Sequence, residues 1–157
     1  MLSGRYFNPD DYLEAAGVRV FTPASNATAF DRAYTDLERA LQSASPASRL
    51  FVVVGVQGGG KTSWIRSNAD QLGYLAYFFD AALPRAVHRA RAISISTEAG
   101  VPAVAVWVRA SLEIALERNK LRRIDHRVPE VAIRSVHSIM EPPSAAEGFI
   151  EVMEVEA

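Results

Sequence analysis

The sequence predicts an α/β domain of three layers, α/β/α, around a mainly parallel sheet of about five strands. Two observations predict this fold. Apolar runs typical of buried strands alternate with amphipathic helical patterns, and a glycine-rich loop joins the first strong strand to the helix after it. A chain of 157 residues suits one domain with its own hydrophobic core.

The elements are expected in a regular order. Strands are predicted at residues 50–54, 74–79, 103–108 and 149–155, and the second and third are almost continuously apolar, as strands covered on both faces are. Helices are predicted between and before them, at residues 62–72, 85–99, 111–122 and 129–140. A further helix is predicted at 29–42, and its apolar face holds Phe30, Tyr34, Leu37 and Leu41. A Ser- and Ala-rich linker follows it at 43–48, and a short strand is expected before it at 18–21.

Composition narrows the class of protein. The net charge of −1 argues against binding nucleic acid through overall charge, while leaving room for a local basic patch. The chain has no cysteine, which excludes disulfides and thiolate metal sites, and its three histidines lie far apart in the sequence. No stretch approaches the ~20 apolar residues of a membrane span, and the N-terminus lacks a signal-peptide pattern. A cytoplasmic protein with no membrane partner is expected.

The glycine-rich loop carries the clearest chemistry. The run from Gly55 to Thr62 reads G-V-Q-G-G-G-K-T and fits G-x-x-x-x-G-K-[ST], the P-loop pattern, with a strand before it and a helix after it. Backbone N–H groups of such a loop cradle phosphates, the lysine adds a positive charge, and the Thr hydroxyl binds Mg²⁺. The alternative is a glycine-rich turn that binds nothing. The expected nucleotide-binding residues are Gly55, Gln57, Gly58, Gly59, Gly60, Lys61, Thr62 and Ser63.

An arginine-rich stretch follows the third predicted strand. Arg118 and Arg122 are four residues apart, so both guanidinium groups reach one face of a helix and one phosphate cluster. Arg123 and Arg127 add charge nearby. A basic flap that closes over phosphates would neutralise the charge that develops in phosphoryl transfer. The alternative is a solvated helix end that pairs with Glu113, Glu117 and Asp125.

The stretch ERNKLRRIDHRVPEVAIRSVHSIMEPPSAAEGFIEV, which begins at Glu117, resembles the lid and C-terminal strand of the polynucleotide kinase-like P-loop kinases, a group related to the zeta-toxin kinases. With the P-loop, the resemblance covers residues 50–155 and implies a kinase-type P-loop NTPase. It implies a nucleotide-binding core at 50–110, a helical lid at 111–140 and a C-terminal strand at 149–155. The matching residues are Arg118-Asn119, Arg122, Val128-Pro129-Glu130, Pro142 or Pro143, and Glu147-Gly148-Phe149.

The same resemblance implies a displaced segment. The family carries a strand with an Asp-Asp-Tyr motif after the P-loop helix, and that unit is missing here, since the helix leads directly to the strand that ends in Asp80. Residues 1–45 are similar to the missing unit, including Asn-Pro-Asp10-Asp11-Tyr12, so the acceptor-side segment is expected at the front of one domain of residues 1–157. The alternative makes residues 1–45 an unrelated helical cap, in which Asp10 and Asp11 cap a helix N-terminus.

The resemblance implies an ATP-dependent kinase that transfers the γ-phosphoryl group to a hydroxyl. Its implied general base is Asp10, with Asp11 as the neighbouring alternative; Lys61, Arg122 and Arg118 would hold the phosphoryl group, and Thr62 and Asp80 the Mg²⁺. The acceptor stays open between a polynucleotide 5′-hydroxyl and a small molecule or nucleotide sugar.

Three departures from the family favour a different function, an ATP-binding switch or regulatory ATPase with little or no transfer. Leu13 stands where the family often has an arginine for the acceptor phosphate, Asp80-Ala-Ala replaces Asp-Thr-Asn, and the order of the segments is unusual. Arg85 and Arg89 are either contacts for an acceptor phosphate or part of an exposed helix face.

Overall fold

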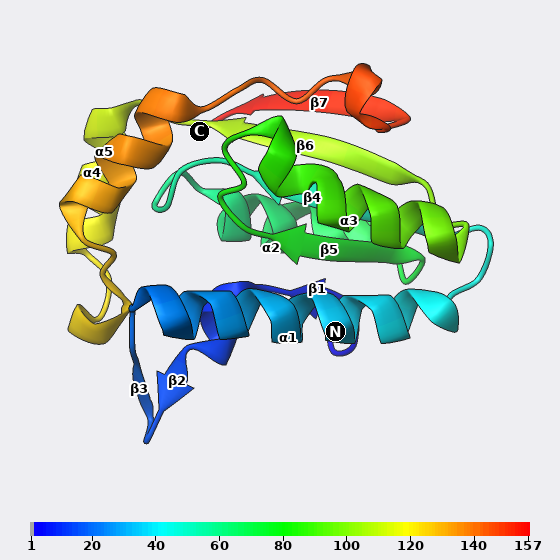
Figure 1. The fold of residues 1–157 in the computed structure, drawn as a ribbon. Helices are drawn as coiled ribbons and strands as arrows, with labels where there is room; N and C mark the ends of the chain where they lie inside the picture. Colours follow the sequence, from blue (N-terminus) through cyan, green and yellow to red (C-terminus); the bar gives the residue numbers. More distant parts are fainter. Residues whose placement is uncertain (1) are drawn as a thin grey trace.

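A computed structural model describes residues 2–157 and confirms the α/β class (Figure 1). Five strands form one sheet in the order β1-β5-β4-β6-β7, and every neighbouring pair is parallel. The last four strands match the predicted ones to within two residues at each end. The strands are β1 (Tyr6–Phe7), β4 (Arg49–Val54), β5 (Ala76–Asp80), β6 (Ala103–Arg109) and β7 (Glu151–Glu156).

Helices cover both faces of this sheet, which makes the three layers. Alternate residues of β4 point to opposite faces, as strand geometry requires: Val52 packs with α1 and α3, whereas Val53 packs with α2. Helices α4 and α5 pack on each other and on Val56 of the loop after β4. The helices are α1 (Pro23–Gln42), α2 (Lys61–Leu72), α3 (Ala86–Ala99), α4 (Leu112–Lys120) and α5 (Glu130–Ile139). Short 3₁₀ turns are η1 (Pro9–Tyr12), η2 (Ile124–His126) and η3 (Ala145–Glu147).

Two predictions for the N-terminal region need correction. Helix α1 begins at Pro23, six residues before the predicted start, because Thr22 and Ser25 form a capping box and Pro23 occupies the first turn. The strand predicted at 18–21 does not join the main sheet. Instead β3 (Val18–Arg19) pairs with β2 (Glu14–Ala15) in a separate antiparallel hairpin, turned by two residues with positive φ, Ala16 and Gly17.

The N-terminal segment reaches the main sheet through β1, which lies parallel to β5 at the sheet edge, with Phe7 opposite Phe79 (Figure 1). Because the strands are parallel, the residues after β1, β4 and β5 all leave the same end of the sheet. This end, where the carboxyl termini of the strands meet, is where open α/β sheets bind ligands. Nothing in residues 2–157 forms a helix long and apolar enough to cross a lipid bilayer.

Candidate functional site

Glycines shape the loop between β4 and α2, and other residues at two of these positions would be strained. Gly58 has φ +78°, and a Cβ added to it would lie 2.5 Å from the carbonyl oxygen of Ala115 in α4. Gly55 has φ +149°, and its Cβ would lie 2.5 Å from the carbonyl oxygen of Val108 in β6. L-residues rarely adopt such backbone angles, and here the added atom would also strike backbone. The glycine loop, residues 55–62, is therefore held tightly between β6 and α4.

Lys61 begins helix α2 directly after the left-handed Gly60. Its side chain is only 9% exposed, and its Nζ donates a weak hydrogen bond to the carbonyl oxygen of Val56 at 3.3 Å. Burial lowers the pKa of Lys61; Asp80 and Asp10 oppose this shift and Arg122 adds to it. An ammonium group that is buried with one weak partner has unused donors, so it favours the arrival of an anion.

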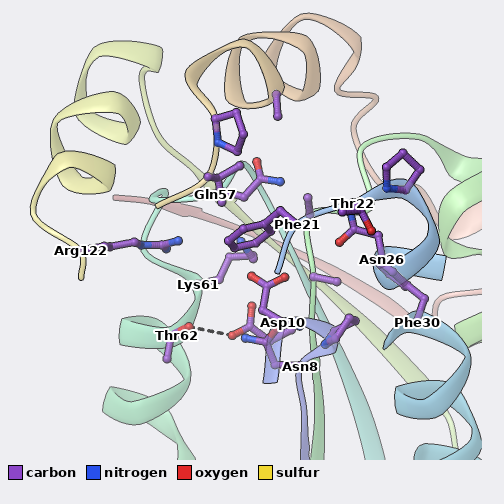
Figure 2. A pocket seen from close by; sticks show the side chains of 18 residues that line it. Asn8, Asp10, Phe21, Thr22, Asn26, Phe30, Gln57, Lys61, Thr62 and Arg122 are labelled. Atoms are coloured by element: carbon purple, nitrogen blue, oxygen red, sulfur yellow. Dashed lines mark hydrogen bonds between the residues drawn. The ribbon is translucent and has the colours of Figure 1, made fainter. Parts of the chain in front are cut away.

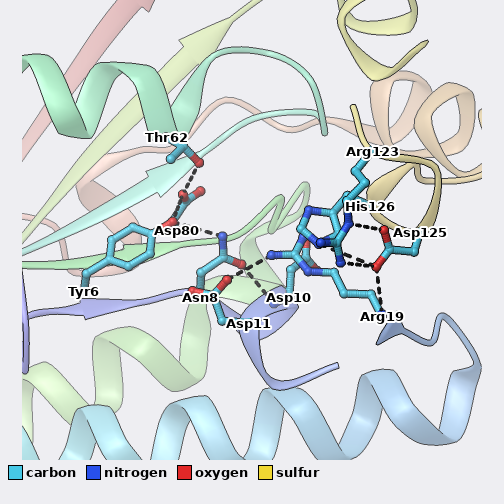
Figure 3. A network of polar contacts seen from close by, with 10 residues as sticks. All are labelled: Tyr6, Asn8, Asp10, Asp11, Arg19, Thr62, Asp80, Arg123, Asp125 and His126. Carbon is cyan, nitrogen blue, oxygen red and sulfur yellow. Dashed lines mark hydrogen bonds and ion pairs between the residues drawn. The ribbon is translucent and has the colours of Figure 1, made fainter. Parts of the chain in front are cut away.

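Asp80, at the end of β5, accepts two hydrogen bonds at one oxygen. Thr62 Oγ1 donates to its Oδ2 at 2.8 Å, and Tyr6 Oη donates to the same atom at 2.7 Å (Figure 3). Asn8 Nδ2 in turn donates to Tyr6 Oη at 3.0 Å. Burial, followed by the charge of Asp80, raises the pKa of Tyr6, which keeps the phenol protonated. This network fixes the orientation of the Asp80 carboxylate.

The sequence did not point to Tyr6. Its role depends on β1 pairing with β5, which sets Tyr6 opposite Phe78, two residues before Asp80. No local sequence motif predicts the pairing of β1 with β5.

Thr62 and Asp80 fit the predicted Mg²⁺ site in part. A hydroxyl and a carboxylate are hard oxygen ligands, and Mg²⁺ is usually held by one or two carboxylates together with substrate phosphates and waters. Within residues 2–157 no group of three or more His, Cys, Asp or Glu residues gathers to hold a metal ion. The donor set thus suits an ion that arrives with a phosphate ligand.

A cavity of about 350 Å³ opens at this end of the sheet, and we call it the central cavity (Figure 2). It is lined from five parts of the chain: the turn after β1, the N-terminal end of α1, the glycine loop, the end of β5 with the residues after it, and the segment after α4. Figure 2 shows Arg122 reaching toward Lys61, with Asp10 close by. Lining residues that carry charge are Asp10, Lys61, Asp80 and Arg122, and the aromatic ones are Phe21 and Phe30.

Asp10 and Asp11 have different surroundings, although they are adjacent in η1. Asp10 lines the central cavity, whereas Asp11 does not and pairs with Arg19 at 3.0 Å. Burial raises the pKa of Asp11, and Arg19 opposes the shift. Neither carboxylate caps a helix, because Asn8 caps η1 and Thr22 caps α1. The structure therefore contradicts the capping role considered for the two aspartates.

Arg118 and Arg122 both lie at the glycine loop. With Gly58, Gly60 and Ser63 they line a smaller cavity beside Lys61. Within residues 2–157 neither arginine forms an ion pair, because Glu117 pairs with Lys120 and Asp125 pairs with Arg123. The paired, solvated helix end is therefore present in part: Arg123 pairs with Asp125 as that alternative requires, whereas Arg118 and Arg122 do not follow it. Two unpaired guanidinium groups over a glycine loop form a site for an anion with several oxygens.

Arg85 and Arg89 lie outside the site. Arg89 is completely buried and makes a two-fold ion pair with Glu147, with Nε–Oε1 and Nη2–Oε2 distances of 2.7 and 3.0 Å. The exposed-face alternative was therefore wrong for Arg89. Arg85 pairs with Glu141 at 3.0 Å on the surface. Both arginines tie α3 to the segment before β7, so their charge is not available to a ligand in the central cavity.

Gln57 and the two alanines after Asp80 complete the cavity wall. Gln57 Oε1 is buried without a hydrogen-bond partner in the described chain, so it can accept a hydrogen bond from a ligand. Ala81 and Ala82 add only apolar surface. The assembled site holds groups that could bind phosphates and a divalent cation, together with the carboxylate of Asp10. No family model matches the sequence.

Proposed function

We propose that the protein is an ATP-dependent P-loop kinase that transfers the γ-phosphoryl group of ATP to a hydroxyl acceptor. The observation that supports this proposal is the composition of the central cavity. One space holds Asp10 together with Lys61, Asp80 and Arg122, so a carboxylate faces the groups that would bind a terminal phosphate. The last three residues suit nucleotide binding, and the carboxylate beside them can accept the proton of an acceptor hydroxyl.

The proposed role of each residue follows from its position in the two cavities. Backbone N–H groups of the glycine loop and Lys61 would hold the β- and γ-phosphates, with Ser63 and Arg118 on the neighbouring side. Asp10 would accept the proton of the acceptor hydroxyl. The acceptor oxygen then bonds to the γ-phosphorus while the bond from that phosphorus to the β–γ bridging oxygen breaks, and ADP leaves.

Charge that develops on the phosphoryl group would be stabilised by Lys61 and Arg122, which line the central cavity from different elements. The chemistry that a bound Mg²⁺ would supply is positive charge against the phosphates. Thr62 and Asp80 would hold that ion, with Tyr6 fixing the carboxylate.

A second function, a nucleotide-dependent switch with little or no transfer, is favoured by Ala81 and Ala82. Their side chains line the central cavity and offer an acceptor no hydrogen bond. In that case Asp10 would orient a water molecule for slow hydrolysis, and no acceptor would be labelled.

The test is transfer of label from γ-labelled ATP with Mg²⁺ to a panel of 5′-hydroxyl RNA and DNA, nucleosides, sugars and nucleotide sugars. The kinase proposal predicts label in at least one acceptor, and loss of that label in Lys61→Ala. The matched control is Lys120→Ala, because Lys120 is an exposed lysine of α4 that pairs with Glu117. ATP that binds and yields only free phosphate would support the switch and contradict the kinase.

A further inference from the structure

One asparagine side chain connects two functional groups of the central cavity. Asn8 lies between β1 and η1, and its Oδ1 accepts a hydrogen bond from the backbone N–H of Asp10 at 2.9 Å. Its Nδ2 donates to Tyr6 Oη at 3.0 Å, and Tyr6 Oη donates to Asp80 Oδ2 at 2.7 Å (Figure 3). An unbroken series of hydrogen bonds therefore extends from the turn that carries Asp10 to the carboxylate of Asp80.

The chemistry of the neighbours fixes the direction of each hydrogen bond in this series. An ionised carboxylate only accepts, so the Tyr6 hydroxyl donates its single proton to Asp80. The Tyr6 oxygen is then available as an acceptor, whereas the Asp10 N–H needs one. The Asn8 amide offers a donor to the first and an acceptor to the second, while an ionised aspartate of the same shape would have no proton for Tyr6. The network therefore uses both ends of the Asn8 amide.

The backbone on either side of Asn8 leaves this side chain little freedom. Tyr6 pairs with Phe78 in the parallel ladder of β1 and β5. Pro9 is buried and has a fixed φ, and a residue before proline favours an extended backbone, which Asn8 has at φ −127° and ψ 115°. Asp11 donates its backbone N–H to the carbonyl oxygen of Asn8 at 3.0 Å. The turn η1 is therefore attached to Asn8 through both the side chain and the backbone.

The Asn8 amide also affects how well Tyr6 donates. Burial, followed by the charge of Asp80, raises the pKa of Tyr6, and the hydrogen bond from Asn8 opposes that shift. A donor to the phenol oxygen makes the phenol proton more acidic, which strengthens the hydrogen bond from that proton to Asp80. Loss of the Asn8 amide would therefore weaken the bond that orients the Asp80 carboxylate.

We propose that Asn8 is a positioning residue that aligns Asp10 with Asp80, through its own hydrogen bond to the Asp10 backbone and through Tyr6. The inference rests on the proposed kinase function for the roles of Asp10 as proton acceptor and Asp80 as Mg²⁺ ligand. It adds to that function the residue that holds these two groups in place relative to each other. A role in capping η1 alone would use only the Oδ1 end of the amide.

The first test measures the link to Asp80 without transfer. Its readout is the Mg²⁺ enhancement, the factor by which Mg²⁺ strengthens the calorimetric binding of a non-hydrolysable ATP analogue to the full-length protein. Asn8→Ser keeps an acceptor that can cap the turn but is too short to reach Tyr6. It should lower the Mg²⁺ enhancement about 3–10-fold, the effect of one neutral hydrogen bond.

The matched control is Asn68→Ser, because the Asn68 amide donates to the Trp64 carbonyl oxygen within helix α2. The control should leave the Mg²⁺ enhancement unchanged. An enhancement in Asn8→Ser equal to that of the wild type overturns the inference.

Combination with Tyr6→Phe shows whether the effect of Asn8 passes through the phenol. In a protein that already carries Tyr6→Phe, Asn8→Ser should not lower the Mg²⁺ enhancement further, because the hydroxyl that Asn8 contacts is gone. A double-mutant cycle detects such non-additivity between residues of one network. Equal reductions in both backgrounds would mean that Asn8 acts by another route, such as general stability, and would also overturn the inference.

The second test measures the link to Asp10. At saturating Mg²⁺, kcat for transfer should stay close to the wild-type value in Asn8→Ser. Asn8→Ala removes the acceptor for the Asp10 N–H and should lower kcat about 10-fold or more, because a small displacement of a catalytic group has an effect of that size. Equal kcat values in the two variants would contradict the positioning of Asp10. Transfer to no acceptor would instead contradict the proposed function, and the Mg²⁺ enhancement would still decide whether Asn8 acts on Asp80 through Tyr6.

Discussion

We predict that nucleotide binding changes the protonation of Lys61. Burial lowers its pKa in the free protein, and phosphates placed beside it would raise that pKa again. At an alkaline pH below the ordinary lysine pKa of about 10.4, ATP binding is therefore expected to take up protons. The affinity for ATP should then fall as the pH rises.

Calorimetry in two buffers of different ionisation enthalpy measures this uptake. Lys61→Met should show less proton uptake than the wild type at the same pH. Equal uptake by both proteins would mean that Lys61 stays fully protonated in the free protein.

Tyr6 holds Asp80, which we propose as a ligand of Mg²⁺. Tyr6→Phe removes the 2.7 Å hydrogen bond to Asp80 Oδ2 and leaves the ring in place. Loss of a partner of this kind typically costs about 10–100-fold in metal affinity. The Mg²⁺ concentration for half-maximal transfer is expected to rise by at least about 10-fold, whereas Tyr74→Phe, at a residue 78% exposed, should not change it. An unchanged Mg²⁺ dependence in Tyr6→Phe would assign Tyr6 to stability alone.

At the scale of elements, the glycine loop depends on close contact with α4. Gly58→Ala would place a methyl group 2.5 Å from the Ala115 carbonyl oxygen, at φ +78°. Gly100→Ala is a matched control, since Gly100 has φ +70° and nothing within 4 Å of its added Cβ. Both should lose ~1–2 kcal/mol of stability from the left-handed backbone.

Only Gly58→Ala should also displace the loop, and so weaken ATP binding by about 10-fold or more. Nucleotide titrations of the two folded variants measure this difference. Equal affinities would show that the loop tolerates the methyl group.

Arg89 connects helix α3 to the segment before β7 through its ion pair with Glu147. Arg89→Met would leave Glu147, whose side chain is 11% exposed, without its partner. Breaking a buried ion pair in this way costs ~3–5 kcal/mol, and the free energy of unfolding in urea should fall by about that amount. Arg85→Met, at a pair whose side chains are about half exposed, should cost less than ~1 kcal/mol. A loss of less than ~1 kcal/mol in Arg89→Met would mean that the ion pair between Arg89 and Glu147 does not stabilise the fold.

The sequence predicted elements best where the signal is local. Strand β6 and the α1 face of Tyr34, Leu37 and Leu41 follow from apolar patterning, and both are buried as expected. The start of α1 was missed because its first turn is polar, and the capping box of Thr22 and Ser25 was not used. The burial of Arg89 was not predictable, since it depends on Glu147, 58 residues away.

For the whole molecule, the parallel sheet brings distant parts of the chain to one end. The loop pattern predicted Lys61 and Thr62, and the helical spacing predicted that Arg118 and Arg122 share a face; the structure sets all four at one cavity edge. The contribution of the N-terminal segment was expected only from a family resemblance. The two-residue β1 is too short to recognise from sequence, yet its pairing with β5 is what brings η1 to the central cavity. The position of Tyr6 depends on that same pairing.

We propose that Asp10, a carboxylate of the N-terminal segment, accepts the proton of the hydroxyl that attacks the phosphate held by the glycine loop. Asp10→Asn tests it most directly, with Asp11→Asn as the matched control, because only Asp10 lines the central cavity. We expect ATP affinity to be retained in both variants, and kcat for transfer to fall ~10²–10⁴-fold in Asp10→Asn but less than about 10-fold in Asp11→Asn. Transfer that persists in Asp10→Asn at the wild-type rate would contradict the claim.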